Sequence, residues 1–495
     1  MALPELTKSY LSKFPQIKSK TLGKTGFRIS ICGFGGYRID EENRLHFEAL
    51  KKALLSGINI IDTSSNYTDG GSEKLIGKVL SELIRQNKVE REEIVVVSKG
   101  GYLQGKNLEI AIAREQSGNG FKDVVKCSPD LWHCISPDFL ENQITLSLKR
   151  LQLEKIDVYL LHNPEYYLTY SAISDPERRE REYYKRIKDA FIHLEKEVSC
   201  GRISYYGISS NTFGEKDTKS NFTSLEKVIG IANEISPDNH FAVVQLPLNL
   251  IESGGINNLN QNGETKSVLE VAAENNLGVL INRPLNAIYK NKLLRLADFK
   301  ITENRTREEI FSLIDDLSKQ EQFLVDKYVN YIGVSASEKN NIIDCLSLSK
   351  ILKTNYHKFD SPSTFQEIKT SYFVPRANFA VNEIGKNLPE DENLTRSLRN
   401  YAVTTNILLS SIFSDLARKK NQENELYHSS INNYLTNQQK TLTLSQKSIL
   451  LINSIKEISS TLVGMKNTEY VEDILSSIES DYIKNALEYW HNNRF

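Results

Sequence analysis

Four polar residues, three of them at the ends of apolar stretches, have the side chains needed to donate a proton and to stabilise a developing negative charge. Asp62 ends "INIID", Tyr67 follows five positions later, Lys99 ends "EEIVVVSK" and His162 ends "IDVYLLH". Buried parallel strands are β-branched runs of this kind, and in a barrel they deliver side chains to one rim. The pattern therefore predicts one site built from four separate stretches.

The chemistry expected of these four groups is the interconversion of a carbonyl and an alcohol. A carbonyl carbon that accepts hydride leaves an alkoxide, which needs a proton from an acid that is still protonated near pH 7. A tyrosine has an ordinary pKa of about 10; the ammonium of Lys99 would lower the pKa of Tyr67, and Asp62 would hold the lysine. His162 would donate a hydrogen bond to the substrate oxygen. Taken singly, each residue type is more often structural, so the prediction rests on their combination.

Strand-like and helix-like segments alternate along the chain to about residue 285, which implies a parallel sheet. An eighth apolar run, "STLVGM", lies far downstream between two segments with helical periodicity. The fold class predicted is α/β, a (β/α)8 TIM barrel. Its strands are expected at residues 29–34, 58–61, 94–98, 156–161, 203–208, 242–245, 279–282 and 460–465.

A long stretch separates the seventh predicted strand from the eighth. Because a structureless loop of this length is rare in a compact domain, and because 308–329, 394–418 and 423–434 are amphipathic, we predict a mostly helical insertion. The expected domains are residues 1–289 (barrel strands one to seven), 290–440 (helical insertion), and 441–495 (last strand, closing helices and tail). Residues 100–136 are predicted to form a lid or substrate wall, since loops after barrel strands lie beside the active site.

Composition points away from several classes of protein. The 62 basic and 63 acidic residues leave a net charge of -1, which gives no reason to expect nucleic acid or an anionic membrane as partner. The five cysteines are scattered without CxxC spacing, so neither a disulfide framework nor a metal site is expected. No apolar leader or spanning run is evident, which favours a soluble cytoplasmic protein.

Several segments together resemble the aldo-keto reductase superfamily over about residues 20–285 and 440–477. They are "LGKTGFRISICGFGGYRI", "INIIDTSSNYTDGGSEKLIGKVL", "VVSKG", "DVYLLHNPE", "YYGISSN", "VVQLPLNL" and "VGMKNTEYVED". The resemblance implies that Asp62, Tyr67, Lys99 and His162 form a catalytic tetrad with Tyr67 as general acid. It also implies NADPH lying across the barrel mouth.

The residues that the resemblance places against the cofactor are Gly35, Gly36, Asp62, Ser209, Asn211, Gln245, Arg283, Gly464, Lys466 and Glu472. Serine, asparagine and glutamine supply the donors and acceptors that a carboxamide needs. A lysine before a helix N-terminus suits a 2′-phosphate, which favours NADP over NAD. Tyr37, Trp132 and His133 are the candidate substrate residues, although Trp132 serves equally well as the buried anchor of its loop.

The sequence departs from the family pattern at three points. Ser210 stands between Ser209 and Asn211, so either Ser210 or Asn211 is a candidate for the second carboxamide contact. Arg283 follows Asn282 where many members have an aromatic residue, so stacking on the nicotinamide comes from arginine or is absent. Asp473 replaces the asparagine expected beside the adenine.

The function predicted is an NADPH-dependent oxidoreductase acting on a small carbonyl or alcohol. One alternative is an NADP(H)-binding regulatory or partner-binding module in which residues 290–440 bind a protein partner or a second copy. Another is a different reaction on the same scaffold, such as sugar oxidation or NADP-assisted epimerisation, because a fold does not determine its substrate.

Overall fold

The computed structural model describes residues 1–290, 292–389 and 391–493. Two compact units divide the chain: Met1–Leu296 together with the segment starting at Ser430, and Ala297–Ser429. The proposal that residues 290–440 act as a separate subdomain stays a prediction.

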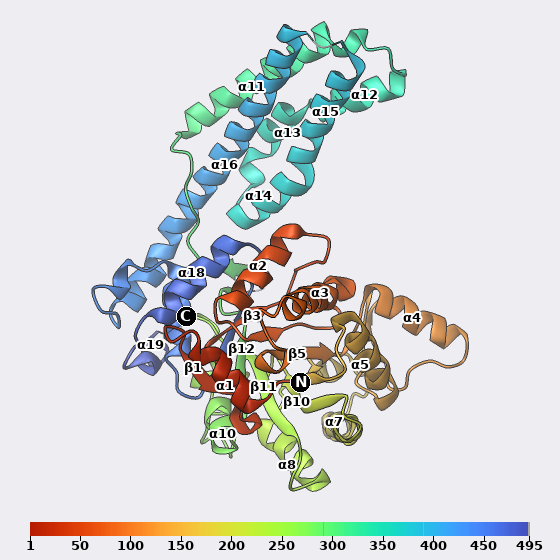
Figure 1. Ribbon diagram of the computed structural model, residues 1–495, viewed down its shortest axis with the longest axis vertical. Helices are drawn as coiled ribbons and strands as arrows, with labels where there is room; N and C mark the ends of the chain where they lie inside the picture. Colours follow the sequence, from red (N-terminus) through yellow and green to blue (C-terminus); the bar gives the residue numbers. More distant parts are fainter. Residues whose placement is uncertain (291, 390, 494–495) are drawn as a thin grey trace. The chain divides into compact units, whose positions relative to one another are not determined.

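The first unit is a closed barrel of parallel strands in the order β10-β11-β12-β15-β3-β4-β5-β9 (Figure 1). Pairing of Leu280 with Ser460 brings the last strand beside β12, so the long intervening segment does not interrupt the sheet. This confirms the predicted (β/α)8 barrel. The strands are β3 (Cys32–Gly35), β4 (Ile60–Asp62), β5 (Val95–Gly100), β9 (Ile156–His162), β10 (Ile203–Ser209), β11 (Phe241–Pro247), β12 (Gly278–Asn282) and β15 (Ser460–Val463).

The predicted first strand, residues 29–34, is two strands in the structure. β2 (Arg28–Ser30) pairs antiparallel with β1 (Ser19–Thr21), whereas β3 enters the barrel between β15 and β4. The chain bends at Ile31, whose amide donates to the carbonyl of Lys18. The sequence does not predict this bend, because the strands on both sides of it are buried and form one continuous apolar run.

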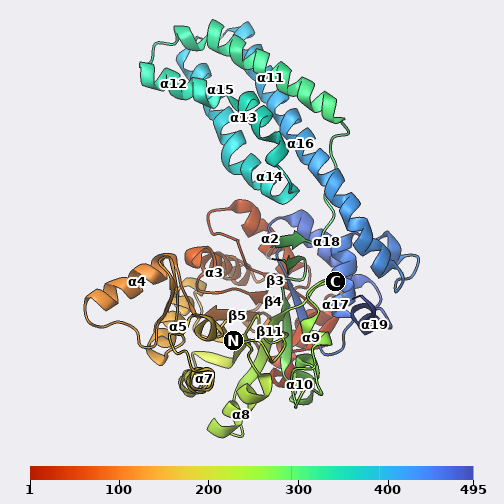
Figure 2. The same cartoon turned by 180° about the vertical axis from the view of Figure 1, so that it is seen from behind.

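Helices form the outer layer of the barrel, as Figures 1 and 2 show. Several begin at a side-chain cap: the hydroxyls of Ser224, Ser267 and Thr443 each accept from a backbone amide of the first turn, which satisfies a donor that the helix cannot. The helices are α1 (Pro4–Ser12), α2 (Arg44–Leu55), α3 (Gly71–Arg85), α5 (Pro137–Leu151), α7 (Pro176–Ser199), α8 (Leu225–Ile235), α10 (Val268–Glu274), α17 (Leu444–Asn453), α18 (Thr468–Glu479) and α19 (Ala486–Asn492).

The barrel interior is filled by alternate side chains of its strands. Val95 and Val97 of β5 and Val158 and Leu160 of β9 are fully buried in this cluster, together with Leu280 of β12. Inward and outward residues alternate along each strand, so the β-branched runs fill the interior while their neighbours face the helices. The last inward positions are left for polar side chains at the rim.

Besides the β1–β2 pair, two further small sheets of the described residues lie outside the barrel. The segment after β5 forms β6 (Tyr102–Leu103), α4 (Gly105–Gln116), β7 (Val125–Ser128) and β8 (Leu131–His133), with strand order β6-β8-β7. After β12, the antiparallel pair β13 (Asn286–Tyr289) and β14 (Lys292–Arg295) follows.

The second unit is helical and has its own hydrophobic core, which includes Ile314 and Leu317 of its first helix and Leu408 and Ile412 of its last. Its helices are α11 (Arg307–Lys327), α12 (Ala336–Cys345), α13 (Leu348–Asn355), α14 (Pro362–Ile368), α15 (Val374–Asn387) and α16 (Glu392–Asn432), the last of which runs past Ser429. In the described ranges, no helix combines the length and the apolarity that crossing a bilayer requires.

A substitution at Gly207 of β10 would test how tightly the barrel strands pack. A Cβ added there would lie 1.8 Å from the carbonyl oxygen of Val243, a backbone atom that cannot move aside. We expect Gly207→Ala to lower the free energy of unfolding by about 3 kcal/mol or more, at the upper end of overpacking costs. The measurement is urea unfolding, monitored by circular dichroism.

Gly230, on the exposed face of α8, is the matched control, because an added Cβ meets nothing within 4 Å. Gly230→Ala should raise stability by up to about 1 kcal/mol, since alanine favours a helix interior over glycine. Equal stabilities of the two variants would contradict the packing described here.

Candidate functional site

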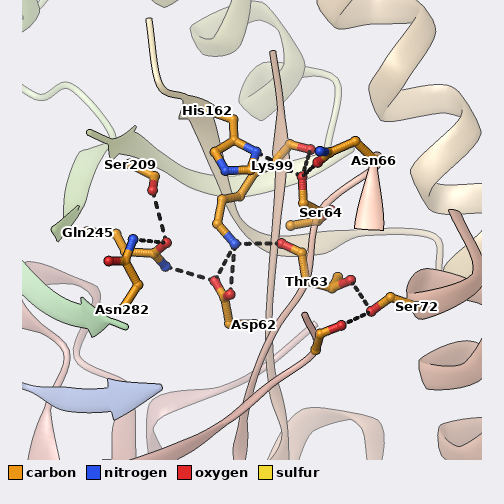
Figure 3. Close-up of polar contacts among 12 residues, drawn as sticks. Asp62, Thr63, Ser64, Asn66, Ser72, Lys99, His162, Ser209, Gln245 and Asn282 are labelled. Atoms are coloured by element: carbon orange, nitrogen blue, oxygen red, sulfur yellow. Dashed lines mark hydrogen bonds and ion pairs between the residues drawn. The ribbon is translucent and has the colours of Figure 1, made fainter. Parts of the chain in front are cut away.

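A buried ion pair between Lys99 and Asp62 lies at the carboxyl ends of the neighbouring strands β5 and β4. The lysine Nζ is 2.7 Å from each carboxylate oxygen of Asp62 and 2.8 Å from the carbonyl oxygen of Thr63 (Figure 3). The lysine side chain is 0% exposed and that of the aspartate 6%. Burial lowers the pKa of Lys99, and the carboxylate of Asp62 opposes that shift. A charge this deep is tolerated only because its partner and the carbonyl satisfy it.

Tyr67 lies against this ion pair. Its ring centroid is 4.9 Å from Nζ of Lys99, and the rings of Tyr37 and His162 meet it edge-on at 5.2 Å and 5.9 Å. Burial raises the pKa of Tyr67 well above its ordinary value, and the charge of Asp62 and the neighbouring Tyr37 add to the rise. The phenol is therefore protonated at neutral pH.

The direction of this shift corrects the prediction that Lys99 lowers the pKa of Tyr67. Burial of the phenol outweighs the nearby cation, and the carboxylate of Asp62, which binds that ammonium through both of its oxygens, raises the pKa further. Sequence reasoning counted the cation beside Tyr67 and did not weigh the anion that neutralises it or the loss of solvent.

His162 ends β9 and is 7% exposed. Its Nδ1 lies 3.0 Å from the hydroxyl oxygen of Ser64, a residue that sequence reasoning did not single out. Burial lowers the pKa of His162 well below its ordinary value, and the charges of Lys99 and His133 contribute in the same direction. The imidazole is therefore neutral at pH 7.

A chain of hydrogen bonds joins the ion pair to the far side of the barrel mouth. Gln245 Nε2 donates to Asp62 Oδ1 at 2.8 Å, and Gln245 Oε1 accepts from Ser209 Oγ at 2.9 Å and from Asn282 Nδ2 at 3.4 Å (Figure 3). Asn282 Oδ1 is buried and, among the described residues, has no hydrogen-bond partner. An acceptor in this state is one that a ligand's N–H groups would satisfy.

The two alternatives for the second carboxamide contact differ in their surroundings. The hydroxyl of Ser210 is buried 3.1 Å from that of Thr212, which commits it to the interior. Asn211 is only partly buried, and its backbone N–H donates to Glu165 Oε1 at 2.9 Å. Burial raises the pKa of Glu165 to about 7. The surroundings favour Asn211 for this contact.

Arg283 takes part in an ion pair. Its Nη2 is 2.6 Å from Glu252 Oε1, and the other oxygen of Glu252 accepts from Asn249 Nδ2 at 2.8 Å. Its backbone is left-handed at φ +51, a costly conformation for arginine that the surrounding loop imposes. Stacking of Arg283 on a nicotinamide would compete with this ion pair.

Gly35 and Gly36 are explained by the packing of β3 itself. A Cβ on Gly36 would lie 2.7 Å from the carbonyl oxygen of Asp62 and from the hydroxyl of Ser72, and one on Gly35 would crowd the backbone of Val463. These glycines let β3 approach its neighbours closely, whatever ligand binds nearby. Gly464 differs, because an added Cβ there meets nothing within 4 Å.

The residues predicted for the adenosine end lie around the start of α18, which Asn467 caps. Glu472 forms an ion pair with Lys52 of α2, and Asp473 accepts from Ser445 Oγ at 2.7 Å. Burial lowers the pKa of His46 in α2, and the positive charge of Lys466 adds to that shift, so this lysine lies near α2 as well. Their role in cofactor binding stays a prediction.

The segment after β5 brings aromatic side chains to His162. The ring of Tyr102 is 4.7 Å from that of His162, and His133 Nε2 lies 2.8 Å from the carbonyl oxygen of His162. Tyr166, after β9, stacks on His133 at 5.5 Å. Tyr102 was missed as a site residue, although it comes three positions after Lys99.

Trp132 does not join His133 beside His162, and the role of either residue in substrate binding stays a prediction. In the small sheet, His133 is opposite Tyr102 and Trp132 is opposite Leu103 and Lys126. Neighbouring strand residues point to opposite faces, so Trp132 faces away from His162. The ammonium of Lys126 lies 4.3 Å from its ring. The alternative of a loop anchor therefore fits Trp132 better.

No cluster of three or more His, Cys, Asp or Glu side chains suited to a metal ion occurs in the described ranges. The site is instead a barrel mouth in which a protonated phenol, a buried ammonium and carboxylate, and a neutral imidazole meet. That combination is typical of a proton-donating site next to a hydride-transfer cofactor.

Comparison with known proteins identifies the class. The sequence model of the aldo/keto reductase family matches residues 32–323, more than half of the chain. The chain belongs to the aldo/keto reductase family.

Individual relatives are more distant. The NADH-specific methylglyoxal reductase of Escherichia coli K12 is 29% identical over 154 residues, 30% of this chain and 42% of that protein. The 6-dehydroglucose reductase of Novosphingobium aromaticivorans is 27% identical over 227 residues, 44% of this chain and 59% of that protein. The chain thus spans about half the length of these curated relatives. A solved aldo/keto reductase from Klebsiella pneumoniae in complex with NADP and acetate is 13% identical, with a TM-score of 0.42 and coverage of 96% of this chain and 95% of that one.

Proposed function

We propose that the protein is an NADPH-dependent oxidoreductase that interconverts a small carbonyl compound and its alcohol, with Tyr67 as the proton donor. The observation that carries the proposal is the buried Lys99–Asp62 ion pair against the ring of Tyr67. Such a pair is costly as a structural device, because apolar residues of similar volume are often as stabilising. Its position beside a phenol at a barrel mouth favours a chemical role.

The residues present fit a nicotinamide cofactor. Asn282 Oδ1 is a buried acceptor without a partner in the described residues, and it lies beside the Gln245–Ser209 pair, where a carboxamide would find both donors and acceptors. Open space at Gly464, just before the capped helix α18, suits a phosphate-bearing chain. When bound, the reduced cofactor supplies hydride to the carbonyl carbon.

The side chains supply the proton and hold its donor. Tyr67 is protonated at neutral pH and donates its phenolic proton to the oxygen that becomes an alkoxide. The phenolate left on Tyr67 lies beside the ammonium of Lys99, which stabilises it. Asp62 keeps the lysine in place through both of its oxygens. Run in reverse, the same groups remove the proton of an alcohol.

The preference for NADPH rests on Lys466 before the N-terminus of α18, where a cation and the helix dipole both favour a 2′-phosphate. One relative is named as NADH-specific, so family membership alone does not decide this choice. Cofactor preference is therefore measured directly in the test.

The test is a turnover assay of the purified full chain with NADPH and with NADH. Its carbonyl panel includes methylglyoxal and oxidised sugars, the substrate types in the names of the relatives. We expect loss of cofactor absorbance at 340 nm, a wavelength set by the reduced nicotinamide, with at least one carbonyl and faster with NADPH. Binding of cofactor without turnover on any carbonyl or alcohol would contradict the proposal and support the regulatory or partner-binding alternative, which the separate core of Ala297–Ser429 favours.

A further inference from the structure

The side chain of Glu165 continues the hydrogen-bond ladder between β9 and β10 past the ends of both strands. The last register pair is His162 with Ser209, and the amide of Asn163 donates to the carbonyl oxygen of Ser209 at 2.7 Å. A parallel ladder would next bond the amide of Asn211 to the carbonyl of Asn163. Asn163 is left-handed at φ +52, so the chain turns there, and the amide of Asn211 donates instead to Oε1 of Glu165 at 2.9 Å. One carboxyl group thus holds the segment that carries Asn211.

The carboxyl of Glu165 is buried among neutral groups. Glu165 is 3% exposed, and its Oε2 makes no hydrogen bond within the described residues. The titratable groups that face it are the phenols of Tyr102, Tyr166 and Tyr183; burial raises the pKa of each, and the charge of Glu165 adds to the rise. Among the described residues, no basic side chain contributes to the pKa of Glu165 itself. A carboxylate in these surroundings is costly, because neither a cation nor a full set of donors replaces the lost water.

Protonation of Glu165 removes most of this cost. Burial raises the pKa of Glu165 to about 7, and hydrogen bonds, among them those from the amide of Asn211 and the hydroxyl of Ser210, oppose the rise. The neutral acid keeps the bond from Asn211, because its carbonyl oxygen still accepts. The ionised form leaves Oε2 without a donor, so water must enter beneath the segment that carries Asn211.

We propose that Glu165 is a positioning residue for the cofactor: its protonated form holds Asn211 in place, so that binding of the nicotinamide cofactor is coupled to proton uptake at Glu165. The inference rests on the proposed function, because Asn211 is the residue favoured for the second contact with the carboxamide. The exchange of the proton is itself a property of the free protein.

The direction of the coupling follows from the change in surroundings on binding. A nicotinamide at the barrel mouth displaces water, which disfavours the carboxylate further and raises the pKa of Glu165 above its value in the free protein. A group whose pKa is higher in the complex takes up a proton on binding. The affinity is therefore constant below about pH 7 and falls as the pH rises above it toward the pKa of the complex.

The first test is a pH titration of the full chain without cofactor by difference infrared spectroscopy, in which a carboxylic acid and a carboxylate absorb at different frequencies. Loss of a band in Glu165→Gln assigns it to Glu165. Burial also raises the pKa of Glu321, in α11 of the helical unit, to about 7, and Glu321→Gln identifies its band. We expect the band of Glu165 to titrate between about pH 6 and about pH 8. A band that stays unchanged over this range would overturn the proposal, whatever the turnover assay shows.

Calorimetry of NADPH binding to the wild-type protein counts the protons. At about pH 7.5 the 2′-phosphate is already ionised, because a phosphate monoester loses its second proton at about pH 6. The dependence of the binding heat on the ionisation enthalpy of the buffer should correspond to uptake of about half a proton per site. Binding without proton uptake would overturn the proposal even if Glu165→Gln does not fold.

Variants test whether Glu165 is the group that takes up the proton. In fluorescence titrations with NADPH, the affinity of the wild-type protein should fall about threefold or more from about pH 6.5 to about pH 8.5. Glu165→Gln keeps an oxygen that accepts from Asn211 and cannot ionise, so its affinity should change much less.

Glu321→Gln is the matched control, because it removes a buried carboxyl from the helical unit whose pKa burial also raises to about 7. Its pH profile should follow that of the wild type. Equal profiles in wild type and Glu165→Gln would defeat this inference and leave the proposed function standing. Failure of both NADPH and NADH to bind would defeat the proposed function, and this inference with it.

Discussion

Replacing Tyr67 with phenylalanine is expected to lower kcat about 10²- to 10⁴-fold, the range that a positioned general acid contributes. The ring would remain 4.9 Å from Nζ of Lys99, so packing around the ion pair should change little. What disappears is the hydroxyl, which is protonated at neutral pH because burial raises its pKa. The measurement is steady-state kinetics with the best carbonyl of the panel, together with cofactor affinity from fluorescence titration.

Cofactor affinity should stay within about threefold of wild type, because the proton donation that Tyr67→Phe removes stabilises the transition state and not the bound cofactor. Tyr170→Phe is the matched control: it removes a phenolic hydroxyl from an exposed tyrosine at the end of α6 (Tyr166–Tyr170). Its kcat should equal that of wild type. A Tyr67→Phe enzyme with wild-type kcat would show that the proton comes from elsewhere.

Replacing Lys99 with methionine should lower the free energy of unfolding by about 3–5 kcal/mol, the cost of leaving one member of a buried ion pair alone. The side chain of Asp62 would lose both of its 2.7 Å contacts to Nζ and, among the described residues, keep the hydrogen bond from Gln245. Methionine fills a similar volume, so the loss is electrostatic rather than a cavity effect. Urea unfolding at pH 7 measures it.

The double variant Lys99→Met, Asp62→Asn separates these causes. It removes both charges and keeps an oxygen for Gln245, so it should recover much of the stability lost in the single variant. Lys51→Met is a comparison from the surface, where the ion pair with Glu82 at 2.7 Å is solvent-screened; its stability should change far less. A double variant less stable than Lys99→Met would contradict this account.

The barrel and its polar rim were predictable because their signals are local. The β-branched and aliphatic residues of runs such as "IVVVSK" and "VYLLH" predict buried strands. The polar residue that ends each run marks the rim of the barrel. The structure accordingly places Lys99 in β5, opposite Leu160 of β9, and His162 at the end of β9, opposite Ser209 of β10. The bend at Ile31 was missed because both of its sides are apolar.

The interactions within the site were not predictable, because they join residues that are distant in sequence. Gln245 and Asp62 are 183 positions apart, and no pattern in either segment signals that the amide binds the carboxylate. The direction of the pKa shift of Tyr67 depends on how completely the phenol is buried and on how close it lies to the charge of Asp62, and both depend on the folded geometry. Ser64 and His162 are 98 positions apart, and no pattern in the sequence predicts their contact either.

The hydrogen bond from Gln245 to Asp62 couples ligand binding at the barrel mouth to the protonation of Tyr67. A ligand that draws the amide of Gln245 toward itself exposes more of the negative charge of Asp62 to Lys99 and to the phenol, and so changes how firmly Tyr67 retains its proton. Thermodynamic reciprocity then requires that the proton on Tyr67 changes the affinity for that ligand by the same factor. Because the phenol stays protonated at neutral pH, this coupling moves no net proton there, and it would appear as a pH dependence of ligand affinity only at alkaline pH, where Tyr67 begins to ionise.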